Sequence, residues 1–305
     1  MEQIHTEDCA MQVEEKSINI KEFKKGRFPI YLVEMENKIH ILKTFPYDQD
    51  RLSTNYFNEV RVGLLSHPNI IGMISCYEET NLIINSIPAK TSSILMEFAP
   101  FGDFYDLLIT HKISLSEQLA RTYFHQLIDA LEYLHMNKIT HMDLKLNNLL
   151  LGENFELKVA DFDLSHLEGD TNIKSRGSKY YRAPEVIIGC CNHPMSADIF
   201  SAGILLFAFK SRGFLPHLEN QTYKGIDLYG LMRNDNEKFW EVHSGIQKNQ
   251  DFYSPEFREL FNLMTKTKPH ERATIQDIKK SAWYNGPVYS VSELKEIMHK
   301  KFVDR

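Results

Sequence analysis

The chain has 305 residues, 43% of them hydrophobic and 25% charged, with 14 glycines and 11 prolines. This composition is typical of a globular protein and excludes a collagen-like, low-complexity or wholly disordered chain. A net charge of −6 argues against a general binder of nucleic acid or anionic membranes, because such binders need an excess of positive charge. The longest apolar stretch, residues 199–209, is too short to cross a bilayer.

Residues 1–16 are acidic and polar, without the apolar run of a secretory signal, and are predicted to form a flexible tail. The cysteines Cys9, Cys76, Cys190 and Cys191 show no C-x-x-C spacing. We therefore expect reduced thiols rather than a zinc or disulfide role. The expected location is the cytoplasm, with the nucleus as an open alternative.

The first third of the chain has mostly strand-like patterns. Residues 27–33 and 38–45 alternate like the two strands of a hairpin, and 93–98 is a further strand. Apolar side chains recur at helical spacing within 55–65, which predicts one amphipathic helix in this region. The apolar positions of that helix are Phe57, Val60, Leu64 and Leu65.

The rest of the chain is mostly helical in pattern. Residues 114–135 carry an apolar stripe at helical spacing and predict a long helix, with Ser114 or Ser116 as its N-cap. Residues 196–210 are apolar on nearly every side, which predicts a helix buried in the middle of a domain. The helical pattern resumes at Phe239 and continues to the end.

The breakers at 100–102 separate a small strand-rich lobe from a larger helical one. Within the larger lobe, 148–151 and 156–160 alternate around a turn and predict a strand-turn-strand unit. Functional sites tend to lie between such units, so we expect a cleft between the lobes.

Five short motifs occur in a fixed order. Residues 141–148 match H-R-D-L-x-x-x-N except at the Arg, 161–163 match two positions of D-F-G, and 183–185 match A-P-E. Upstream, Lys43 lies in a strand, as the Lys of V-A-I-K does, and Glu59 lies on the following helix. Each match alone is weak, but five in the right order and in the right elements are strong.

In this order the motifs resemble those of the eukaryotic protein kinase family, from Ser17 to Tyr284. The resemblance implies an α+β class and a bilobal protein-kinase fold, with a small β-rich N-lobe that carries one key helix and a larger, mostly α-helical C-lobe. The implied parts are a kinase domain at 17–285, divided into N-lobe 17–96, hinge 97–101 and C-lobe 102–285, and a C-terminal amphipathic helix at 286–305.

The resemblance also implies the catalytic residues. Phosphoryl transfer needs positioning and charge neutralisation more than covalent chemistry. Asp143 would accept the proton of the substrate hydroxyl, and Lys145 would reach the γ-phosphate. Asn148 and Asp161 would bind Mg²⁺, with Mn²⁺ as the alternative metal. Ser178, before A-P-E, is expected to contact Asp143 and Lys145 through its hydroxyl, and like Lys145 it resembles the serine/threonine type.

ATP is the nucleotide that the resemblance implies. Lys43 would hold the α- and β-phosphates, with Glu59 fixing its ammonium; Asn58 is the neighbouring alternative to Glu59. The hinge would follow Met96 as gatekeeper. The expected nucleotide contacts are Gly26, Lys43, Glu59, Glu97, Ala99 and Asp103.

Other matches are structural. Asp198 lies in a string that resembles the buried-helix motif D-x-W-S-x-G, with Phe for Trp. Arg272 lies where the family pairs an arginine with the glutamate of A-P-E, here Glu185. We expect this pair to serve stability rather than catalysis.

The chain departs from the family pattern at three places. The phosphate-covering loop keeps only Gly26, because Lys24 and Pro29 replace glycines that let backbone N–H groups approach a phosphate. Asp163 replaces the glycine of D-F-G and brings a second carboxylate near the metal. Met142 replaces the arginine of H-R-D.

The substitution at Met142 has a regulatory consequence. That arginine usually pairs with a phosphorylated activation segment, and a thioether cannot pair with a phosphate. We therefore expect activity to be independent of phosphorylation at Thr171 or Ser175.

The predicted function is ATP- and Mg²⁺-dependent phosphorylation of serine and threonine hydroxyls on protein substrates, without nucleic-acid binding or membrane insertion. The motifs resemble the calmodulin-dependent-kinase-like group more than receptor or tyrosine kinases, and the sequence of residues 181–185 also occurs in the cyclin-dependent type, which stays an alternative. A pseudokinase that binds nucleotide or acts as a scaffold is the main alternative, and a small-molecule kinase is a weaker one. The apolar side of the C-terminal helix is Leu294, Ile297, Met298 and Phe302. In the plainest interpretation it packs on the large lobe; the alternatives are a docking helix for a partner and the start of a longer chain's next domain.

Overall fold

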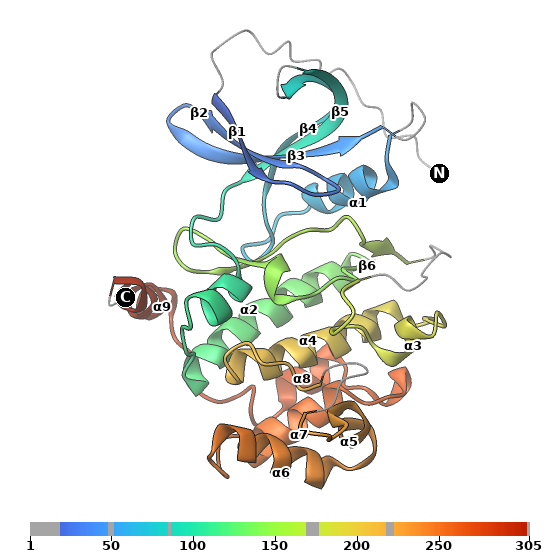
Figure 1. The fold of residues 1–305 in the computed structure, drawn as a ribbon, viewed down its shortest axis with the longest axis vertical. Coiled ribbons are helices and arrows are strands. Elements are labelled where there is room, and N and C mark those ends of the chain that lie inside the picture. The colour runs from blue at the N-terminus through green and yellow to red at the C-terminus, as the bar shows by residue number, and fades with distance from the viewer. Residues whose placement is uncertain (1–18, 48–51, 85–86, 169–176, 218–222, 304–305) are drawn as a thin grey trace.

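The computed structural model describes residues 19–47, 52–84, 87–168, 177–217 and 223–303. The predicted tail at 1–16, and Thr171 and Ser175, lie outside these residues. Figure 1 shows two lobes, a small one built around a curved sheet and α1, and a larger helical one below it. The predicted bilobal fold is confirmed.

The smaller lobe has a five-stranded sheet in the order β1-β2-β3-β5-β4, in which all paired neighbours are antiparallel. The β2–β3 hairpin turns at Glu36 and Asn37, both in the left-handed backbone region (φ 53° and 63°), which suits the twist of a two-residue turn. The strands are β1 (Asn19–Lys24), β2 (Ile30–Met35), β3 (Lys38–Pro46), β4 (Met73–Ile84) and β5 (Ile87–Glu97).

The predicted helix of the smaller lobe is α1 (Thr54–Gly63), capped by the Ser53 side chain. Of the apolar positions in the predicted helix, Val60 and Leu65 pack against the core, but Phe57 is 46% and Leu64 71% exposed. The buried residues of α1 include Asn58 and Glu59. Asn58 and Glu59 face polar and charged partners, whereas Tyr56 and Val62 are buried in the hydrophobic core.

The larger lobe is built around two long helices, α2 and α4, that pack against each other. Ser116 caps α2, as one of the two predicted alternatives. Helix α4 is buried over most of its length, as predicted, because its sequence is apolar on nearly every side. The helices are α2 (Glu117–Met136), α3 (Pro184–Ile187), α4 (Pro194–Lys210), α5 (Leu228–Asn234), α6 (Asn236–Gln247), α7 (Pro255–Met264), α8 (Ile275–Lys280) and α9 (Val291–Val303).

Short elements between α2 and α3 carry the polar motifs. The predicted strand-turn-strand unit is present as the antiparallel pair β7 and β8. The short strand β6 pairs with β9 and starts the loop 141–148. These elements are β6 (Ile139–Thr140), η2 (Leu146–Asn148), β7 (Leu149–Leu151), β8 (Leu157–Val159) and β9 (His166–Leu167). Two further short helices lie elsewhere, η1 (Asp106–Thr110) before α2 and η3 (Pro269–Glu271) before α8.

Helix α9 covers the side of the larger lobe near the connection between the lobes (Figure 1). Leu294 and Met298 are fully buried, and the Phe302 ring lies 5.4 Å from that of Phe101. The chain's own larger lobe therefore occupies this apolar side, as the plainest interpretation expected. Ser290 caps the helix together with Glu293.

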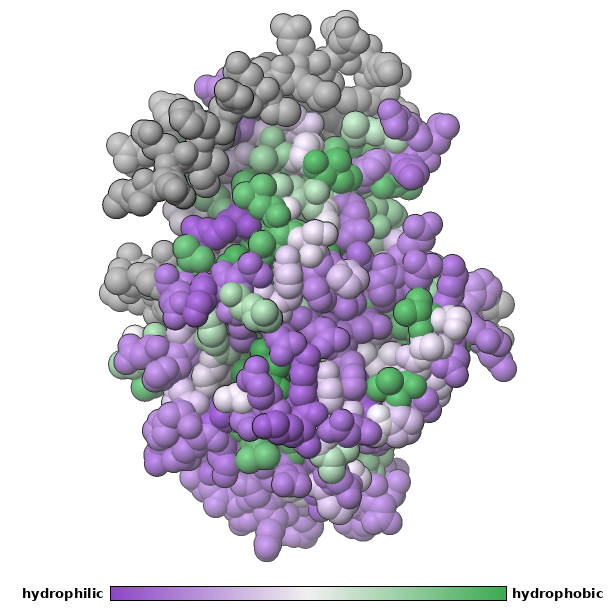
Figure 2. Space-filling view, turned by 180° about the vertical axis from the view of Figure 1, so that it is seen from behind, coloured by the Kyte–Doolittle hydropathy of each residue, from purple (hydrophilic) through white to green (hydrophobic). Residues whose placement is uncertain are grey.

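The surface opposite to the view of Figure 1 is mostly hydrophilic over the larger lobe, with apolar residues in small groups (Figure 2). No helix of the described residues is both long and apolar enough to span a membrane.

A buried ion pair joins α3 to the segment between η3 and α8. The Arg272 guanidinium donates to both carboxylate oxygens of Glu185, at 2.7 and 2.8 Å. We expect Glu185→Ala to destabilise the fold by about 3–5 kcal/mol, because Arg272 would stay buried without its counter-charge. Urea denaturation measures this. Glu271→Ala, which breaks the exposed pair with Lys268, is the control and should change the midpoint little. An equally small change for both variants would contradict the prediction.

Candidate active site

The buried helix α4 holds the loop 141–148 in place through Asp198. The carboxylate of Asp198 accepts hydrogen bonds from the backbone N–H groups of His141 and Met142, at 2.8 and 2.9 Å. It also contacts His135 Nε2 at 3.0 Å. His141 lies 3.0 Å from the carbonyl oxygen of Ala160 through Nε2. The predicted structural role of Asp198 thus takes the form of positioning this loop.

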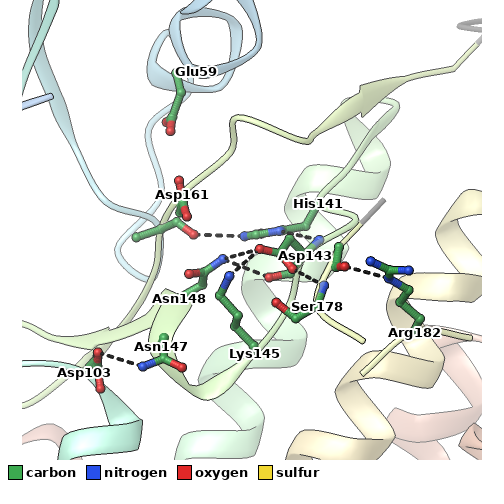
Figure 3. Close-up of polar contacts among 12 residues, drawn as sticks. Glu59, Asp103, His141, Asp143, Lys145, Asn147, Asn148, Asp161, Ser178 and Arg182 are labelled. Carbon is green, nitrogen blue, oxygen red and sulfur yellow. Dashed lines mark hydrogen bonds and ion pairs between the residues drawn. The ribbon is translucent and has the colours of Figure 1, made fainter. Parts of the chain in front are cut away.

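Asp143, Lys145 and Asn148 come together in this loop (Figure 3). Lys145 Nζ lies 2.5 Å from Asp143 Oδ2. The Asn148 side-chain amide donates to the Asp143 carbonyl at 2.9 Å and to Oδ2 at 3.3 Å. The side-chain oxygen Oδ1 of Asn148 is therefore left for another partner. The Asp143 carboxylate is held in one orientation by groups on both sides.

The contact of Ser178 differs from the expectation. Its backbone N–H, not its hydroxyl, donates to Asp143 Oδ1, at 2.6 Å. The preceding Gly177 has φ +88°, and a Cβ there would lie 2.3 Å from the carbonyl oxygen of Met142. Only glycine fits this close approach of the two backbones. Gly177 thereby brings the Ser178 amide to Asp143.

Lys43 joins α1 to the segment that follows β8. Its Nζ forms an ion pair with Glu59 and lies 2.5 Å from Asp161 Oδ1. Burial alone would lower the pKa of Lys43, but the charges of Glu59 and Asp161 outweigh it and raise this pKa. Burial likewise opposes ionisation of Asp161, yet the Lys43 ammonium lowers the pKa of that carboxyl. Both groups are therefore charged near neutral pH.

Asp163 adds a third carboxyl to this region. Burial, and next the charge of Asp161, raise the pKa of Asp163 to about 7. Its backbone carbonyl accepts hydrogen bonds from the side-chain amides of Asn55 and Asn58 on α1, at 2.9 and 3.0 Å. Apolar periodicity carries no signal for these two contacts. Glu59, not Asn58, is the partner of Lys43.

The hinge residues lie at the end of β5 and just after it, between the lobes. The Glu97 carboxylate accepts from the Gly72 backbone N–H at 2.7 Å and lies 3.0 Å from Lys158 Nζ. The Glu97 side chain is thus used within the protein, and its main chain is the part that could contact a nucleotide. Met96 pairs with Ile41 across the sheet, and Ala99 is buried.

Asp103 lies just after the hinge and is bound on both oxygens. Oδ1 accepts from the Asp106 backbone N–H at 2.8 Å, and Oδ2 from the Asn147 amide at 3.3 Å. Burial raises the pKa of Asp103. A ribose hydroxyl could donate to the remaining lone pairs, since each carboxylate oxygen accepts more than one hydrogen bond.

Gly26 lies in the exposed connection between β1 and β2, with open space around its Cα. The register places Ile30 opposite Lys43 and Tyr31 opposite Leu42. Phe28 packs on Phe45, with ring centroids 4.9 Å apart, and lies 5.7 Å from Lys43 Nζ. An aromatic ring, rather than a run of glycines, thus lies next to the Lys43 ammonium. The glycine pattern did not predict this contact.

The acidic residues suit a metal shared with phosphates. No group of three or more His, Cys, Asp or Glu side chains within the described ranges could hold a metal alone. Mg²⁺ is usually bound by one or two protein ligands together with substrate phosphates. The Asp161 side chain is 39% exposed and Asn148 offers its amide oxygen, so this pair fits such a shared site.

Comparison with known proteins adds the family. A family model for the protein kinase domain matches residues 30–284. SNF1-like protein kinase ssp2 of Schizosaccharomyces pombe is 33% identical over 228 residues, which are 73% of this chain and 34% of that protein. CBL-interacting serine/threonine-protein kinase 24 of Arabidopsis thaliana is 34% identical over 255 residues, 83% of this chain and 51% of that protein.

A third relative, NUAK family SNF1-like kinase 1 of Homo sapiens, is 32% identical over 223 residues, 72% of this chain and 30% of that protein. The chain thus spans about a third to a half of the length of these relatives. Kinases of this family use ATP with a divalent metal and act on protein substrates. The matched family model covers both lobes and every motif from Lys43 to Arg272. The chain belongs to the eukaryotic protein kinase family.

Proposed function

We propose that this chain transfers the γ-phosphoryl group of ATP to serine and threonine hydroxyls of protein substrates, with Mg²⁺ as the metal. The observation that carries the proposal is the arrangement of Asp143. Its carboxylate is fixed by Lys145, Asn148 and the Ser178 amide. It lies in the same site as Asp161 (Figure 3). Lys43 Nζ lies 2.5 Å from Asp161 Oδ1.

In this proposal each residue has a defined task. The substrate oxygen attacks the γ-phosphorus while the bond to the β-phosphate oxygen breaks and ADP leaves. Asp143 orients the attacking hydroxyl and accepts its proton. Lys145, beside Asp143, neutralises charge on the γ-phosphate, and Lys43 does so on the α- and β-phosphates.

The metal would be held by Asp161 and the Asn148 amide oxygen. When bound, Mg²⁺ neutralises charge on the β- and γ-phosphates. The Lys43 ammonium keeps Asp161 ionised and in place. Mn²⁺ prefers the same oxygen ligands and is the alternative metal.

The nucleotide would be held between the lobes. Ala99 and the main chain of Glu97 would contact the base, and Asp103 the ribose. The loop around Gly26 would cover the phosphates with fewer free N–H groups than three glycines would give, because Pro29 has none. Lys43 and the metal therefore carry a larger share of phosphate binding.

The acceptor residue tests the proposal. The protein is incubated with γ-radiolabelled ATP, Mg²⁺ and the generic substrates casein and histone, and the labelled proteins are hydrolysed to amino acids. We expect phosphoserine and phosphothreonine and no phosphotyrosine. Label on tyrosine would contradict the assigned type, and no label with either Mg²⁺ or Mn²⁺ would favour the pseudokinase alternative.

A further inference from the structure

The inward side of α1 is polar at the end that faces the segment 161–163. Asn58 is 4% and Glu59 5% exposed, whereas the apolar Phe57 between Tyr56 and Asn58 points outward at 46%. Burying an amide is unfavourable unless its hydrogen bonds are made. The orientation of α1 therefore requires partners for these polar groups.

One backbone oxygen supplies the partner. The carbonyl of Asp163 accepts from Asn55 Nδ2 at 2.9 Å and from Asn58 Nδ2 at 3.0 Å. The two asparagines are three positions apart, so they lie on one face of the helix. A carbonyl oxygen has two lone pairs and can accept both bonds. We call these two bonds the amide latch.

The amide latch continues the contact made by Glu59. On the same helix, Glu59 pairs with Lys43, which contacts Asp161. Helix α1 thus contacts both ends of the segment 161–163. At Asp161 the contact runs through the charged Lys43, and at Asp163 it consists of neutral amide hydrogen bonds. Movement of α1 away from the lower lobe would break both ties.

The residues in between are fixed as well. Phe162 is 1% exposed and its ring lies 4.8 Å from that of His141. At Asp163 the family's glycine is replaced by a residue with fewer backbone conformations. The segment thus presents its carbonyl to α1 from a restricted backbone.

We infer that Asn55 and Asn58 are positioning residues, which hold Glu59 on Lys43 and Asp161 toward the metal without a phosphorylated activation segment. The inference rests on the proposed kinase activity. The amide latch replaces a contact that the loop 141–148 cannot make, because Met142 offers no positive charge to a phosphate. Neutral donors suit the place, since another carboxylate beside Asp161 and Asp163 would be repelled.

The test compares four variants of the whole chain after phosphatase treatment. Asn55→Ala and Asn58→Ala each remove one bond of the amide latch, and the double variant removes both. Asn58→Leu keeps the shape of the side chain but removes the donor. The matched control is Asn285→Ala, because the Asn285 amide also donates to two carbonyls, those of Lys279 and Ser281, but beyond α8.

We expect the double variant to lose at least about tenfold in kcat and to need at least about threefold more Mg²⁺ for half-maximal activity. Asn58→Leu should behave like Asn58→Ala. The control should keep the wild-type kcat and Mg²⁺ dependence. Wild-type kcat and Mg²⁺ dependence in the double variant would overturn the inference. So would a wild-type Asn58→Leu beside an impaired Asn58→Ala, because side-chain volume rather than hydrogen bonding would then matter.

Hydrogen exchange of the same samples separates the two proposals. Peptides from α1 and from 157–167 should exchange faster in the double variant than in the wild type and the control. A wild type that transfers no phosphate would overturn the proposed function, and exchange would then decide the amide latch alone. Unchanged exchange of the α1 peptides in the double variant would contradict the amide latch.

Discussion

Replacing Asp143 by Asn lowers kcat by about 10²-fold or more and leaves the affinity for Mg²⁺–ATP nearly unchanged. The amide has almost the same shape but cannot accept the proton of the substrate hydroxyl. Its contacts with Lys145 and the Ser178 amide also lose the negative charge that attracts these donors. Steady-state kinetics and ATP titration by thermal shift measure the two quantities.

Asp235→Asn is the matched control for this variant. Asp235 caps α6 in the larger lobe, where its Oδ1 accepts from the Lys238 backbone N–H at 3.0 Å. Asparagine is an equally good N-cap, so the control keeps its activity. If Asp143→Asn also retained wild-type turnover, Asp143 would not be the proton acceptor.

Replacing Asp161 by Ala abolishes metal-dependent nucleotide binding and phosphate transfer together. The phosphates would lose the ion that neutralises them, because Asn148 alone offers the metal only an uncharged oxygen. The measurement is the shift of the melting temperature with ATP, with and without Mg²⁺. We expect Mg²⁺ to add nothing to this shift in the variant. An Mg²⁺-dependent stabilisation as large as in the wild type would show that Asp161 does not bind the metal.

The variant also tests the role of Lys43. Without Asp161 the ammonium keeps Glu59 as its charged partner, so the fold of the smaller lobe should survive. Circular dichroism of Asp161→Ala checks this. A loss of folded structure would mean that the binding result reports unfolding, and Asp161→Asn, which keeps the side-chain shape, then takes its place.

The motifs and the hydrophobic periods predicted most of the fold. The hairpin β2–β3, the long helix α2 and the buried helix α4 each have a strong local pattern, so their sequence alone specifies them. Hairpin strand β2 begins at Ile30 rather than at residue 27, and Ile30 pairs with Lys43 of β3. Strand ends depend on a partner that the strand's own sequence does not contain.

The orientation of α1 could not be predicted from its apolar positions. The pattern favours burial of Phe57 and Leu64, yet both are exposed. Burial of Glu59 is favourable because Lys43, sixteen residues earlier, supplies its counter-charge. Such a tertiary contact overrides local amphipathicity, and its only signal in the sequence was the order of the motifs.

The loop around Ser178 shows the same limit at atomic scale. The motif correctly indicated that this residue lies near Asp143, but not that its backbone N–H makes the contact. That detail depends on the left-handed backbone of Gly177 and its close approach to Met142. A motif specifies residue types, whereas the donor atom is set by the path of the backbone.

The central claim is that the chain is a catalyst and not only a nucleotide-binding fold. The most direct measurement is a time course of radiolabelled phosphate transferred from ATP to casein by phosphatase-treated protein with Mg²⁺, and the same time course with EDTA. We predict a linear increase beyond one phosphate per protein molecule with Mg²⁺ and none with EDTA. Mg²⁺-dependent ATP binding without transfer beyond one phosphate per molecule would contradict the claim.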